Sequence, residues 1–411
     1  MTARVLVVVE QLRRPVPGGI GRYAVGLLDG LSAGGGEEGA VTLFASRPPR
    51  PGATGGGVSP AAPADPLARF GFEVRSSRLP GWLLTRAWDR GLGSLPVPCD
   101  VVHAVSLAVP PRRIPRRRLG PGGPPGGPRA LCVVVHDLAW RRHADATTAR
   151  GRGWHEAALR RALAGADAVV VPSSAVADEL APEVDRGRTR VAVIAWGADH
   201  LPPPDRGGAG QLLAAHGVDG PYLFTASTLE PRKNLPRLFA AYQSVVSSLP
   251  ERWPLVVAGP SGWGGGAAGG PATGPGRVVM LGPVGDAVLS GLYAGARLLA
   301  YVPLSEGYGF PPVEAMAAGT PVLASAGVPS VAPEATKWPG GAGAPGPGDE
   351  MAAEVVDATD VDAIAAGLLV VATDEQRRAE LAARGRALVA GRRWSMVAAR
   401  HRRLWDELGW K

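Results

Sequence analysis

The sequence predicts an α/β fold built on two doubly wound parallel sheets, one in each of two domains. Short apolar runs rich in β-branched residues recur between stretches with helical periodicity, a pattern typical of buried parallel strands joined by helical crossovers. The runs form two series, separated by the proline- and glycine-rich residues 197–220, which we interpret as the interdomain linker. At 411 residues, the chain is long enough for two domains that bury their cores without disulfides or metals.

Each series predicts the strands of one sheet. In the first series, the strands are expected at residues 4–9, 41–45, 100–103, 131–136, 168–172 and 190–194, with a helix after the first strand that runs to about Leu31. In the second series, strands are expected at residues 222–226, 255–259, 278–282, 297–302 and 321–324, and helices at residues 235–248, 286–294 and 312–318. A final helix is predicted over residues 392–408, after Gly391.

The excess of positive over negative charge lies entirely in the first half of the chain. Residues 1–200 carry 26 arginines and 17 acidic side chains, a net charge of +9, whereas residues 201–411 carry −1. Much of the excess lies in residues 111–118, ahead of a glycine- and proline-rich loop. Two explanations of these arginines stay open. They belong to a solvated loop without a partner, or they attract anionic lipid head groups or an acidic acceptor. Nucleic acid is not expected as a partner, because no aromatic residues alternate with the arginines for base stacking.

The sequence predicts neither secretion nor a membrane span. The apolar run within residues 1–10 is too short for a signal peptide, and no stretch approaches the ~18 uninterrupted apolar residues of a membrane span. Two cysteines, Cys99 and Cys132, are too few for a disulfide framework. We therefore expect a cytoplasmic protein whose contact with the inner face of the cell membrane, where it occurs, is peripheral.

Two segments place glycine or titratable residues at the ends of predicted strands. Gly18 and Gly19 follow the first strand, where glycine lets the backbone approach a ligand at the carboxyl edge of the sheet. Their Gly-Gly-x-Gly spacing is not the dinucleotide fingerprint, so a nicotinamide cofactor is not expected. His136 and Asp137 end a strongly apolar strand. His136 is placed to offer a hydrogen bond or a proton to a substrate, although a structural role is equally open.

A third segment holds two carboxylates, Glu306 and Glu314. Glu306 follows a predicted strand, and Glu314 lies in the first turn of the helix predicted after the next loop. The loop between them contains Gly307 and Gly309, and Pro312 marks the start of the helix. Both carboxylates can therefore face one crevice. A favourable interaction with the helix dipole, about 0.3–1 kcal/mol, would explain Glu314 alone. It would explain neither Glu306 nor the two loop glycines.

The only asparagine of the chain, Asn234, stands beside Lys233, one of three lysines in a chain with 41 arginines. A lysine kept in such a composition indicates a need for a compact point charge, as on a crowded phosphate group. Asn234 is predicted to cap the helix that follows. The N-terminus of that helix would also favour an anion held by Arg232 and Lys233. Chance and helix capping together remain the alternative.

No catalytic metal is predicted. Asp360 and Asp362 match a D-x-D pattern seen in metal-dependent sugar transfer, but either Thr359 or Asp360 starts an apolar-periodic stretch, and N-capping of a helix explains the pattern better. No group of histidines and cysteines has the spacing of metal ligands.

In these motifs and their order, the chain resembles the retaining glycosyltransferases of the GT-B fold, most of all family 4 (group 1) and its mannosyltransferases. The shared segments are Gly18-Gly19, His136-Asp137, residues 172–174, residues 229–234, Gly259 with residues 262–264, and Glu306 with Glu314. The resemblance implies two Rossmann-like domains facing across a cleft. Residues 1–198 would form the acceptor domain and residues 199–390 the nucleotide-sugar donor domain, and residues 391–411 would return as a helix to the first domain.

The resemblance also implies the role of each site residue in a metal-independent hexosyltransferase, whose nucleotide diphosphate sugar is a substrate and which needs no cofactor. Arg232 and Lys233 would hold the donor diphosphate. Glu314 would bind the ribose, Glu306 the transferred sugar, and His136 the sugar ring near its anomeric carbon. Backbone N–H groups that would contact the phosphates and the sugar belong to Gly18, Gly19, Gly307, Tyr308, Gly309 and Phe310.

The family suggests a chemical route and leaves the substrates partly open. Because the family lacks a well-placed carboxylate nucleophile, the expected route is same-face substitution, in which the leaving phosphate oxygen takes the acceptor proton. GDP-mannose is favoured over UDP-sugars as the donor. The acceptor would be a hydroxyl of a glycan, a glycolipid or a small molecule, in polysaccharide or glycolipid assembly. Two alternatives stay open: a nucleotide-sugar epimerase of the same fold, and a non-enzymatic binding module that uses the basic N-terminal surface.

Overall fold

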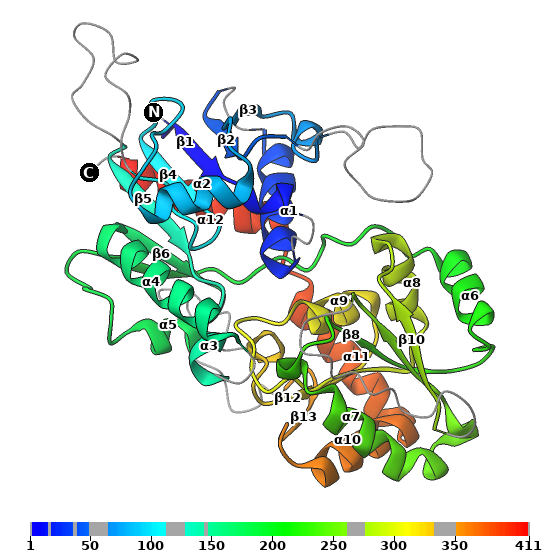
Figure 1. The fold of residues 1–411 in the computed structure, drawn as a ribbon. Helices are drawn as coiled ribbons and strands as arrows, with labels where there is room; N and C mark the ends of the chain where they lie inside the picture. The colour runs from blue at the N-terminus through cyan, green and yellow to red at the C-terminus, as the bar shows by residue number, and fades with distance from the viewer. Residues whose placement is uncertain are drawn as a thin grey trace, which may run out of the picture.

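The computed structural model describes residues 2–14, 18–35, 39–48, 65–111, 128–143, 147–260, 276–332 and 351–409. These residues form two α/β domains, each built on one parallel sheet with helices packed around it, and the domains lie against each other (Figure 1). The predicted fold class is confirmed. The arginine-rich residues 112–118 and the motif at residues 262–264 lie outside the described residues.

The N-terminal sheet has seven parallel strands in the order β3-β2-β1-β4-β5-β6-β7. Its strands are β1 (Val5–Val8), β2 (Val41–Ala45), β3 (Glu73–Ser76), β4 (Val101–Ala104), β5 (Ala130–Val134), β6 (Ala168–Val171) and β7 (Arg190–Val193). Its helices are α1 (Gly18–Ala33), α2 (Gly81–Asp89), α3 (Ala139–Arg142), α4 (Ala149–Gly165) and α5 (Ser174–Leu180), with short 3-10 turns at Glu10–Arg13 and Ala68–Phe70. The strand order reverses between β1 and β4, so a crevice opens at the carboxyl ends of these strands.

The C-terminal sheet repeats this plan with six parallel strands in the order β10-β9-β8-β11-β12-β13. Its strands are β8 (Leu223–Ala226), β9 (Leu255–Ala258), β10 (Val278–Gly282), β11 (Leu298–Tyr301), β12 (Val322–Ser325) and β13 (Glu354–Val356). Its helices are α6 (Arg206–Ala215), α7 (Leu235–Val245), α8 (Asp286–Gly295), α9 (Phe310–Ala318), α10 (Val361–Thr373) and α11 (Glu375–Val389), with 3-10 turns at Pro231–Lys233, Val246–Ser248, Pro250–Arg252 and Pro329–Val331. Here the order reverses between β8 and β11.

Every strand predicted from an apolar run is present, and the two that were missed are edge strands. The interior strands are buried along their whole length, which is why β1, β5 and β6 are apolar at every position. The missed strand β3 is exposed at three of its four positions, and β13 has only three residues, all partly exposed. An edge strand needs no apolar run, because one of its sides faces solvent.

The segment predicted to be the linker is only partly extended. Residues 206–215 within it form helix α6, whose N-cap residue Asp205 accepts a hydrogen bond from the backbone N–H of Gly208 at 2.8 Å. This helix packs against α8, where a Cβ on Gly291 would lie 2.3 Å from the carbonyl oxygen of Asp205. The glycines taken as linker signals therefore belong in part to a packed helix. Of the two residues predicted to cap α10, Thr359 and Asp360, the cap is Asp360, whose carboxylate accepts from the N–H groups of Asp362 and Ala363.

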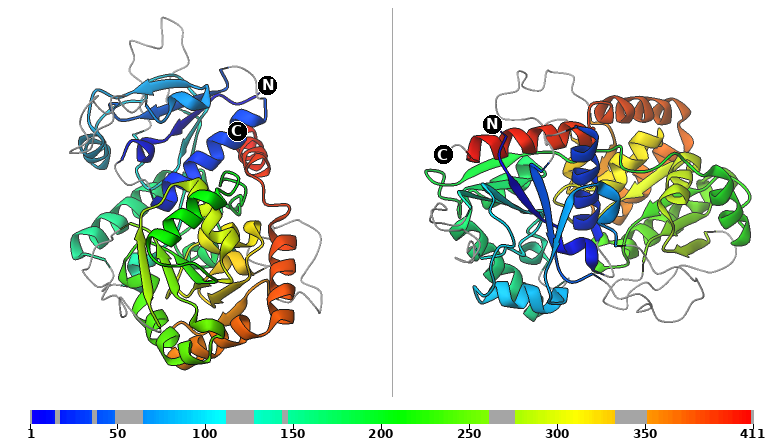
Figure 2. Two further views of the ribbon diagram at one scale, coloured as in Figure 1. Left: turned by 90° about the vertical axis from the view of Figure 1, so that its right-hand side faces the viewer. Right: turned by 90° about the horizontal axis from the view of Figure 1, so that it is seen from above.

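The last helix, α12 (Trp394–Gly409), leaves the C-terminal domain and packs along α1 of the N-terminal domain (Figure 2). Two glycines of α1 allow this close approach. A Cβ on Gly26 would lie 2.1 Å from the Trp394 ring, and one on Gly30 would lie 2.2 Å from the Trp394 carbonyl oxygen. No helix in the described part of the chain is long and apolar enough to span a bilayer.

A buried chain of hydrogen bonds joins α12 to α1 and β4. The Nδ1–H group of His401 donates to the Val397 carbonyl at 2.8 Å, so its Nε2 accepts from the Tyr23 hydroxyl at 2.9 Å. Nδ1 of His103 accepts from the Trp405 indole at 3.4 Å, so its Nε2–H donates to Tyr23 at 3.3 Å. All the donors and acceptors are matched only when both imidazoles are neutral.

Acidification is expected to loosen this helix. Burial lowers the pKa of His401 to about 4, and burial together with the neighbouring imidazoles lowers the pKa of His103 well below its ordinary value. Below about pH 6.5 the unfolded chain binds protons that the folded chain does not. The free energy of unfolding should therefore fall by about 1.4 kcal/mol per pH unit for each histidine as the pH drops from about 6.5 toward 4. Thermal melts at pH 7.5, 6 and 5 measure this slope.

The His401→Gln variant serves as the control for this pH dependence, because glutamine does not titrate in this range. The slope of stability against pH should be shallower in this variant. In the wild-type protein, the protection factors of the α12 amides against hydrogen exchange should fall as the pH falls. A wild-type helix whose amides stay equally protected at pH 7.5 and pH 5 would contradict the assignment.

Candidate active site

Three predicted site residues of the C-terminal domain meet at the carboxyl ends of β8 and β11, the point where the strand order reverses: Arg232, Lys233 and Glu306. After β8 the chain enters a 3-10 turn at Pro231–Lys233, and after β11 it enters the loop that carries Glu306 and leads into α9. The two strands are hydrogen-bonded neighbours, so their exit loops lie side by side. Doubly wound sheets bind ligands at this kind of position.

Glu306 and the two predicted cations form one hydrogen-bonded cluster. Lys233 Nζ lies 2.6 Å from Glu306 Oε1, and Arg232 Nη1 lies 3.0 Å from Glu306 Oε2. The Tyr301 hydroxyl donates to Glu306 Oε1 at 2.7 Å and accepts from Lys233 Nζ at 3.1 Å. Arg232 Nη2 also donates to Glu230 Oε1 at 3.0 Å. The structure therefore brings Arg232, Lys233 and Glu306 together.

The electrostatics of the cluster keep Glu306 ionised. Burial alone would raise its pKa, but Arg232 and Lys233 outweigh burial and lower the pKa to about 2. Burial and the adjacent Glu306 raise the pKa of Tyr301, so its hydroxyl remains a donor. Two cations thus share the carboxylates of Glu306 and Glu230 next to the amino end of α7, and an anion that displaced Glu306 would meet both cations and the helix dipole.

Asn234 does not cap α7 with its side chain, which corrects the prediction. The residue occupies the N-cap position in the left-handed region, with φ of 60°, and its side chain makes no capping bond. Its amide group instead donates to the carbonyl oxygens of Val302 and Ala358, at 3.0 and 2.7 Å. Asn234 therefore ties the 3-10 turn to the loop after β11, and asparagine suits the position because it tolerates positive φ.

Glu314 lies in the second turn of α9 and is almost fully buried, with 3% of its side chain exposed. Its Oε1 accepts from Arg22 Nη1 at 2.8 Å and from His200 Nε2 at 2.7 Å, and its Oε2 accepts from the Tyr293 hydroxyl at 2.7 Å. Burial would raise the pKa of Glu314, but Arg22 and the hydrogen bonds from His200 and Tyr293 lower it to about 2. Its partners are thus specific side chains, and the helix-dipole explanation is unnecessary.

Two of these partners, Arg22 and His200, were missed by sequence reasoning. Arg22 follows the Gly-Gly-x-Gly segment on α1, and it crosses from the N-terminal domain to Glu314 and Asp286 of the C-terminal domain. His200 lies in the connection between the domains, where its Nδ1 accepts from the Trp394 indole at 3.4 Å. An arginine in the first helix after a glycine loop is the signal that could have identified Arg22, whereas no pattern marks His200.

On the N-terminal side, His136 lies directly against the loop that carries Glu306. A Cβ on Gly307 would lie 1.8 Å from the His136 carbonyl oxygen, and the Ser173 hydroxyl donates to the Gly307 carbonyl at 2.8 Å. The Nε2–H group of His136 donates to the Val105 carbonyl at 2.8 Å. Burial lowers the pKa of His136 despite this bond, so the ring is neutral and Nδ1 is left as an acceptor.

The other predicted binding residues lie on two glycine-containing segments. Gly18 and Gly19 open helix α1, and a Cβ on either would meet open space. Gly309, with φ of 97°, ends the loop before Phe310 at the start of α9. The Tyr308 side chain turns away from the cluster and donates to the Trp196 carbonyl at 2.7 Å. Tyr308 can therefore offer a ligand its backbone, whereas its hydroxyl is committed to the interdomain connection.

A cavity of about 380 Å³ adjoins the cluster and is lined by both domains. Its walls mix apolar surface, such as the Trp140 side chain, with the polar side chains of Asp137, His143, Thr147, Thr148, Glu230 and Arg232. His143 Nε2 lies 2.7 Å from the Ser305 hydroxyl, next to Glu306 in the chain. The cavity is therefore close enough to the cluster for a second substrate to lie beside a ligand held there.

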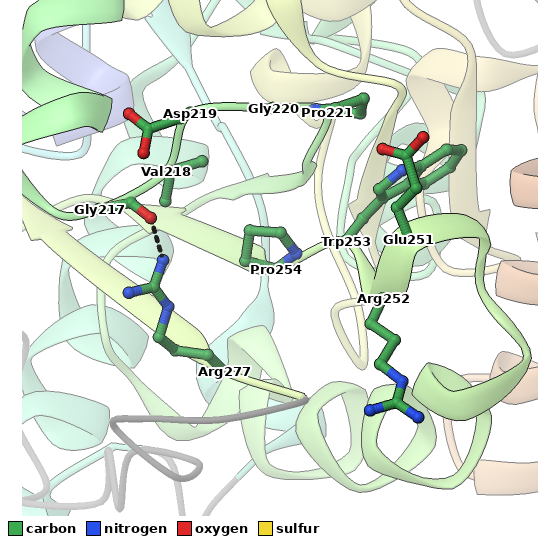
Figure 3. A pocket seen from close by; sticks show the side chains of 10 residues that line it. All are labelled: Gly217, Val218, Asp219, Gly220, Pro221, Glu251, Arg252, Trp253, Pro254 and Arg277. Carbon is green, nitrogen blue, oxygen red and sulfur yellow. Dashed lines mark hydrogen bonds between the residues drawn. The ribbon is translucent and has the colours of Figure 1, made fainter.

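A second hollow lies at the opposite end of the C-terminal sheet (Figure 3). Its lining residues precede strands β8, β9 and β10, as Pro221, Pro254 and Arg277 show. Arg277 closes one side by donating to the Gly217 carbonyl at 2.7 Å. Ligands of doubly wound folds bind at the carboxyl ends of the strands, so this hollow is not a candidate for the donor. Within the described ranges, no group of three or more His, Cys, Asp or Glu side chains is arranged to hold a metal ion.

Comparison with known families matches each domain to one model. Residues 17–200 match the model described as Glycosyltransferase Family 4, and residues 214–388 match the model described as Glycosyl transferases group 1. Together the two matches include both glycine segments, His136, the cationic pair and both glutamates.

Similar proteins share parts of the sequence. O-antigen chain mannosyltransferase B of Escherichia coli is 37% identical over 169 residues, 40% of this chain and 40% of that protein. The serotype-specific mannosyltransferase WbdA of Escherichia coli is 27% identical over 205 residues, 49% of this chain and 23% of that protein. The chain thus aligns with less than half the length of these relatives.

Solved structures share the whole fold. Sucrose-phosphate synthase from Thermosynechococcus elongatus superposes with a TM-score of 0.65 at 17% identity, over 98% of both chains. Anabaena HepE in complex with UDP-glucose superposes with a TM-score of 0.64 at 15% identity, over 98% of this chain and 100% of that chain. At this identity the likeness shows the arrangement of the two domains and nothing of the substrates.

Proposed function

This chain belongs to the GT-B glycosyltransferases of group 1 and family 4, and we propose that it moves a mannosyl residue from GDP-mannose to a sugar hydroxyl with retention of configuration. The observation that carries the proposal is the meeting of Arg232 and Lys233 with Glu306 at the carboxyl ends of β8 and β11. The mannosyl donor is supported by the mannosyltransferases among its relatives. UDP-sugars are the second choice of donor.

In this proposal each charged residue has one task. The diphosphate of the donor takes the place of Glu306 as the principal partner of Lys233 and Arg232, which neutralise charge on the leaving nucleotide. Glu306, released from the two cations, accepts hydrogen bonds from hydroxyls of the transferred sugar. His136 accepts another through Nδ1, and Glu314 binds the ribose. Because two cations compensate the leaving diphosphate, we propose that neither a metal nor a cofactor is required.

The chemical step is a same-face substitution at the anomeric carbon. The bond between that carbon and the phosphate oxygen breaks, and a bond to the acceptor oxygen forms on the same face of the sugar. The acceptor proton moves to the phosphate oxygen that leaves, so no protein base is consumed. A covalent intermediate would need a carboxylate close to the anomeric carbon. We propose no such role for Glu306, whose carboxylate accepts hydrogen bonds from the Tyr301 hydroxyl and from the bound sugar.

We propose that the acceptor occupies the cavity beside Arg232. Asp137 and Glu230 bring negative charge to its walls, and the charge of Arg232 is already shared between Glu230 and Glu306. These walls favour a neutral polyhydroxyl compound over a phosphorylated one, because the two carboxylates repel an anion. A glycan end or the sugar of a glycolipid fits this description. Peripheral contact with an anionic membrane stays a proposal based on the arginines of the N-terminal half.

The test is a donor panel with and without an acceptor. Purified protein is incubated with GDP-mannose, UDP-glucose or ADP-glucose, each with and without methyl α-mannoside or an α-linked mannobiose. We expect GDP release and a new α-linked disaccharide or trisaccharide only when GDP-mannose and a sugar acceptor are both present, with the rate unchanged by EDTA. Nuclear magnetic resonance of the anomeric proton identifies the linkage.

The same panel separates the alternatives. An epimerase would convert the nucleotide-sugar without an acceptor. A non-enzymatic module would show no turnover, and none of the nucleotides would raise its melting temperature, since stabilisation requires binding to the folded state. Turnover with UDP-glucose alone would replace the donor assignment and keep the reaction class.

A further inference from the structure

Arg22 is a link between the domains that ends on the proposed ribose carboxylate. Its Nη1 donates to Glu314 Oε1 at 2.8 Å, and its Nη2 lies 3.3 Å from Asp286 Oδ1. Arg22 belongs to α1, whereas Glu314 and Asp286 belong to α9 and α8 of the other domain. It is the N-terminal-domain side chain that donates to Glu314 in the described structure.

The carboxylate oxygens of Glu314 are largely occupied by hydrogen bonds from the protein. Glu314 Oε1 already accepts two hydrogen bonds, from Arg22 and His200, and Oε2 accepts one from Tyr293. Only 3% of the Glu314 side chain and 4% of the His200 side chain are exposed, whereas 28% of Arg22 is exposed. Arg22 is thus the outermost of the three donors and the one that a ligand arriving from solvent would meet first.

We propose that Arg22 is a gate over the ribose subsite, and that a nucleoside diphosphate must displace it from Glu314 to bind. This inference rests on the proposed role of Glu314 as the ribose ligand. His200 and Tyr293 remain on Glu314 when Arg22 leaves, so the carboxylate stays paired while a ribose hydroxyl takes the vacated position on Oε1. The guanidinium also keeps a partner, because Asp286 is exposed and already within reach.

Because Arg22 contacts both Glu314 and Asp286, the proposal predicts that two substitutions change nucleotide affinity in opposite directions. Loss of the Arg22 charge removes the competitor of the ribose and should tighten nucleotide binding. Loss of the Asp286 charge removes the partner that receives the displaced guanidinium and should weaken nucleotide binding. A residue that simply contacted the phosphates would behave differently, since Arg22→Gln would then weaken binding of every diphosphate.

The experiment is isothermal titration of the full-length protein with GDP, UDP and inorganic pyrophosphate. For Arg22→Gln we expect the Kd of both nucleotides to fall about tenfold and the Kd of pyrophosphate, which has no ribose, to change by less than about twofold. For Asp286→Asn we expect the Kd of both nucleotides to rise about threefold. Arg22→Lys, which keeps a charge but not the planar fork, should lie between wild type and Arg22→Gln.

Each result decides the proposal. Weaker nucleotide binding by Arg22→Gln, unchanged binding, or a change of the same sign in Asp286→Asn overturns the gate and leaves the proposed function standing. Nucleotide binding by Arg22→Gln but not by wild type supports the gate in its strongest form. If neither protein binds GDP or UDP, and both remain folded by circular dichroism, the proposed function and the gate fall together.

Discussion

Replacing Lys233 by alanine is expected to lower kcat about 100- to 1,000-fold, the range found when one preorganised donor is removed from a site of developing charge. In the structure Lys233 contacts Glu306 at 2.6 Å and Tyr301 at 3.1 Å. When the donor diphosphate is bound, the same ammonium group would stabilise the negative charge of the leaving nucleotide. Alanine removes that charge and adds nothing in its place.

The substitution should leave the protein folded. Glu306 keeps Arg232 at 3.0 Å and the Tyr301 hydroxyl at 2.7 Å, so its buried charge is not stranded. We expect the melting temperature of Lys233→Ala to stay within a few degrees of wild type.

Steady-state kinetics with GDP-mannose and a mannoside acceptor measure the loss. Lys233→Arg is the matched variant, because it restores the charge in a bulkier, planar form and should recover part of the rate. Glu306→Gln provides a second comparison, since it removes the Glu306 charge and leaves Glu230 as the carboxylate partner of both cations. A Lys233→Ala enzyme with wild-type turnover would remove the phosphate role from this residue.

The parts of the fold that could be predicted are those in which burial determines sequence. Interior strands such as β1 and β6 are covered on both faces, so they are apolar at every position. The edge strand β3 is polar because solvent covers one of its sides, and nothing in its four residues distinguishes it from a loop. The helix α6 was missed for another reason. Gly207 and Gly208 indicate a linker, but they lie in the first turn of a helix that packs on α8, where Gly291 meets Asp205 and Ala209.

The candidate site was predictable where one motif supplies both the chemistry and its position. Arg232, Lys233 and Glu306 each follow a strand, and neighbouring parallel strands end at the same edge. The environment of Glu314 was not predictable, because Arg22 and His200 come from segments 292 and 114 residues away. Asn234 was misread for a related reason: its amide serves distant carbonyls rather than its own helix.

Replacing Gly307 by alanine is expected to lower turnover at least 100-fold by forcing the two domains apart at the site. A Cβ there would lie 1.8 Å from the His136 carbonyl oxygen and 2.8 Å from the Asp137 Cβ, both on the other domain. These atoms belong to backbone or to short side chains and cannot rotate away. The loops must therefore separate by more than about 1 Å, a displacement that can cost a factor of about 100 in rate when reacting groups are aligned across it.

The separation would act on alignment more than on binding. The Ser173 hydroxyl would lose its 2.8 Å hydrogen bond to the Gly307 carbonyl, and His136 would move away from the sugar that Glu306 holds. Arg232 and Lys233 lie on the C-terminal domain and keep their arrangement, so the Kd for GDP should change far less than kcat. Each domain should also keep its fold, which circular dichroism and hydrogen exchange can verify.

Gly153→Ala is the matched control, because Gly153 lies inside α4 and a Cβ there meets open space. That variant should keep wild-type turnover and gain about 0.5–1 kcal/mol of stability from the better helix former. The comparison isolates the interdomain contact, since both substitutions add one methyl group. Wild-type turnover in Gly307→Ala would mean that catalysis takes place with the domains farther apart than in this structure, and His136 would then lose its proposed role beside the transferred sugar.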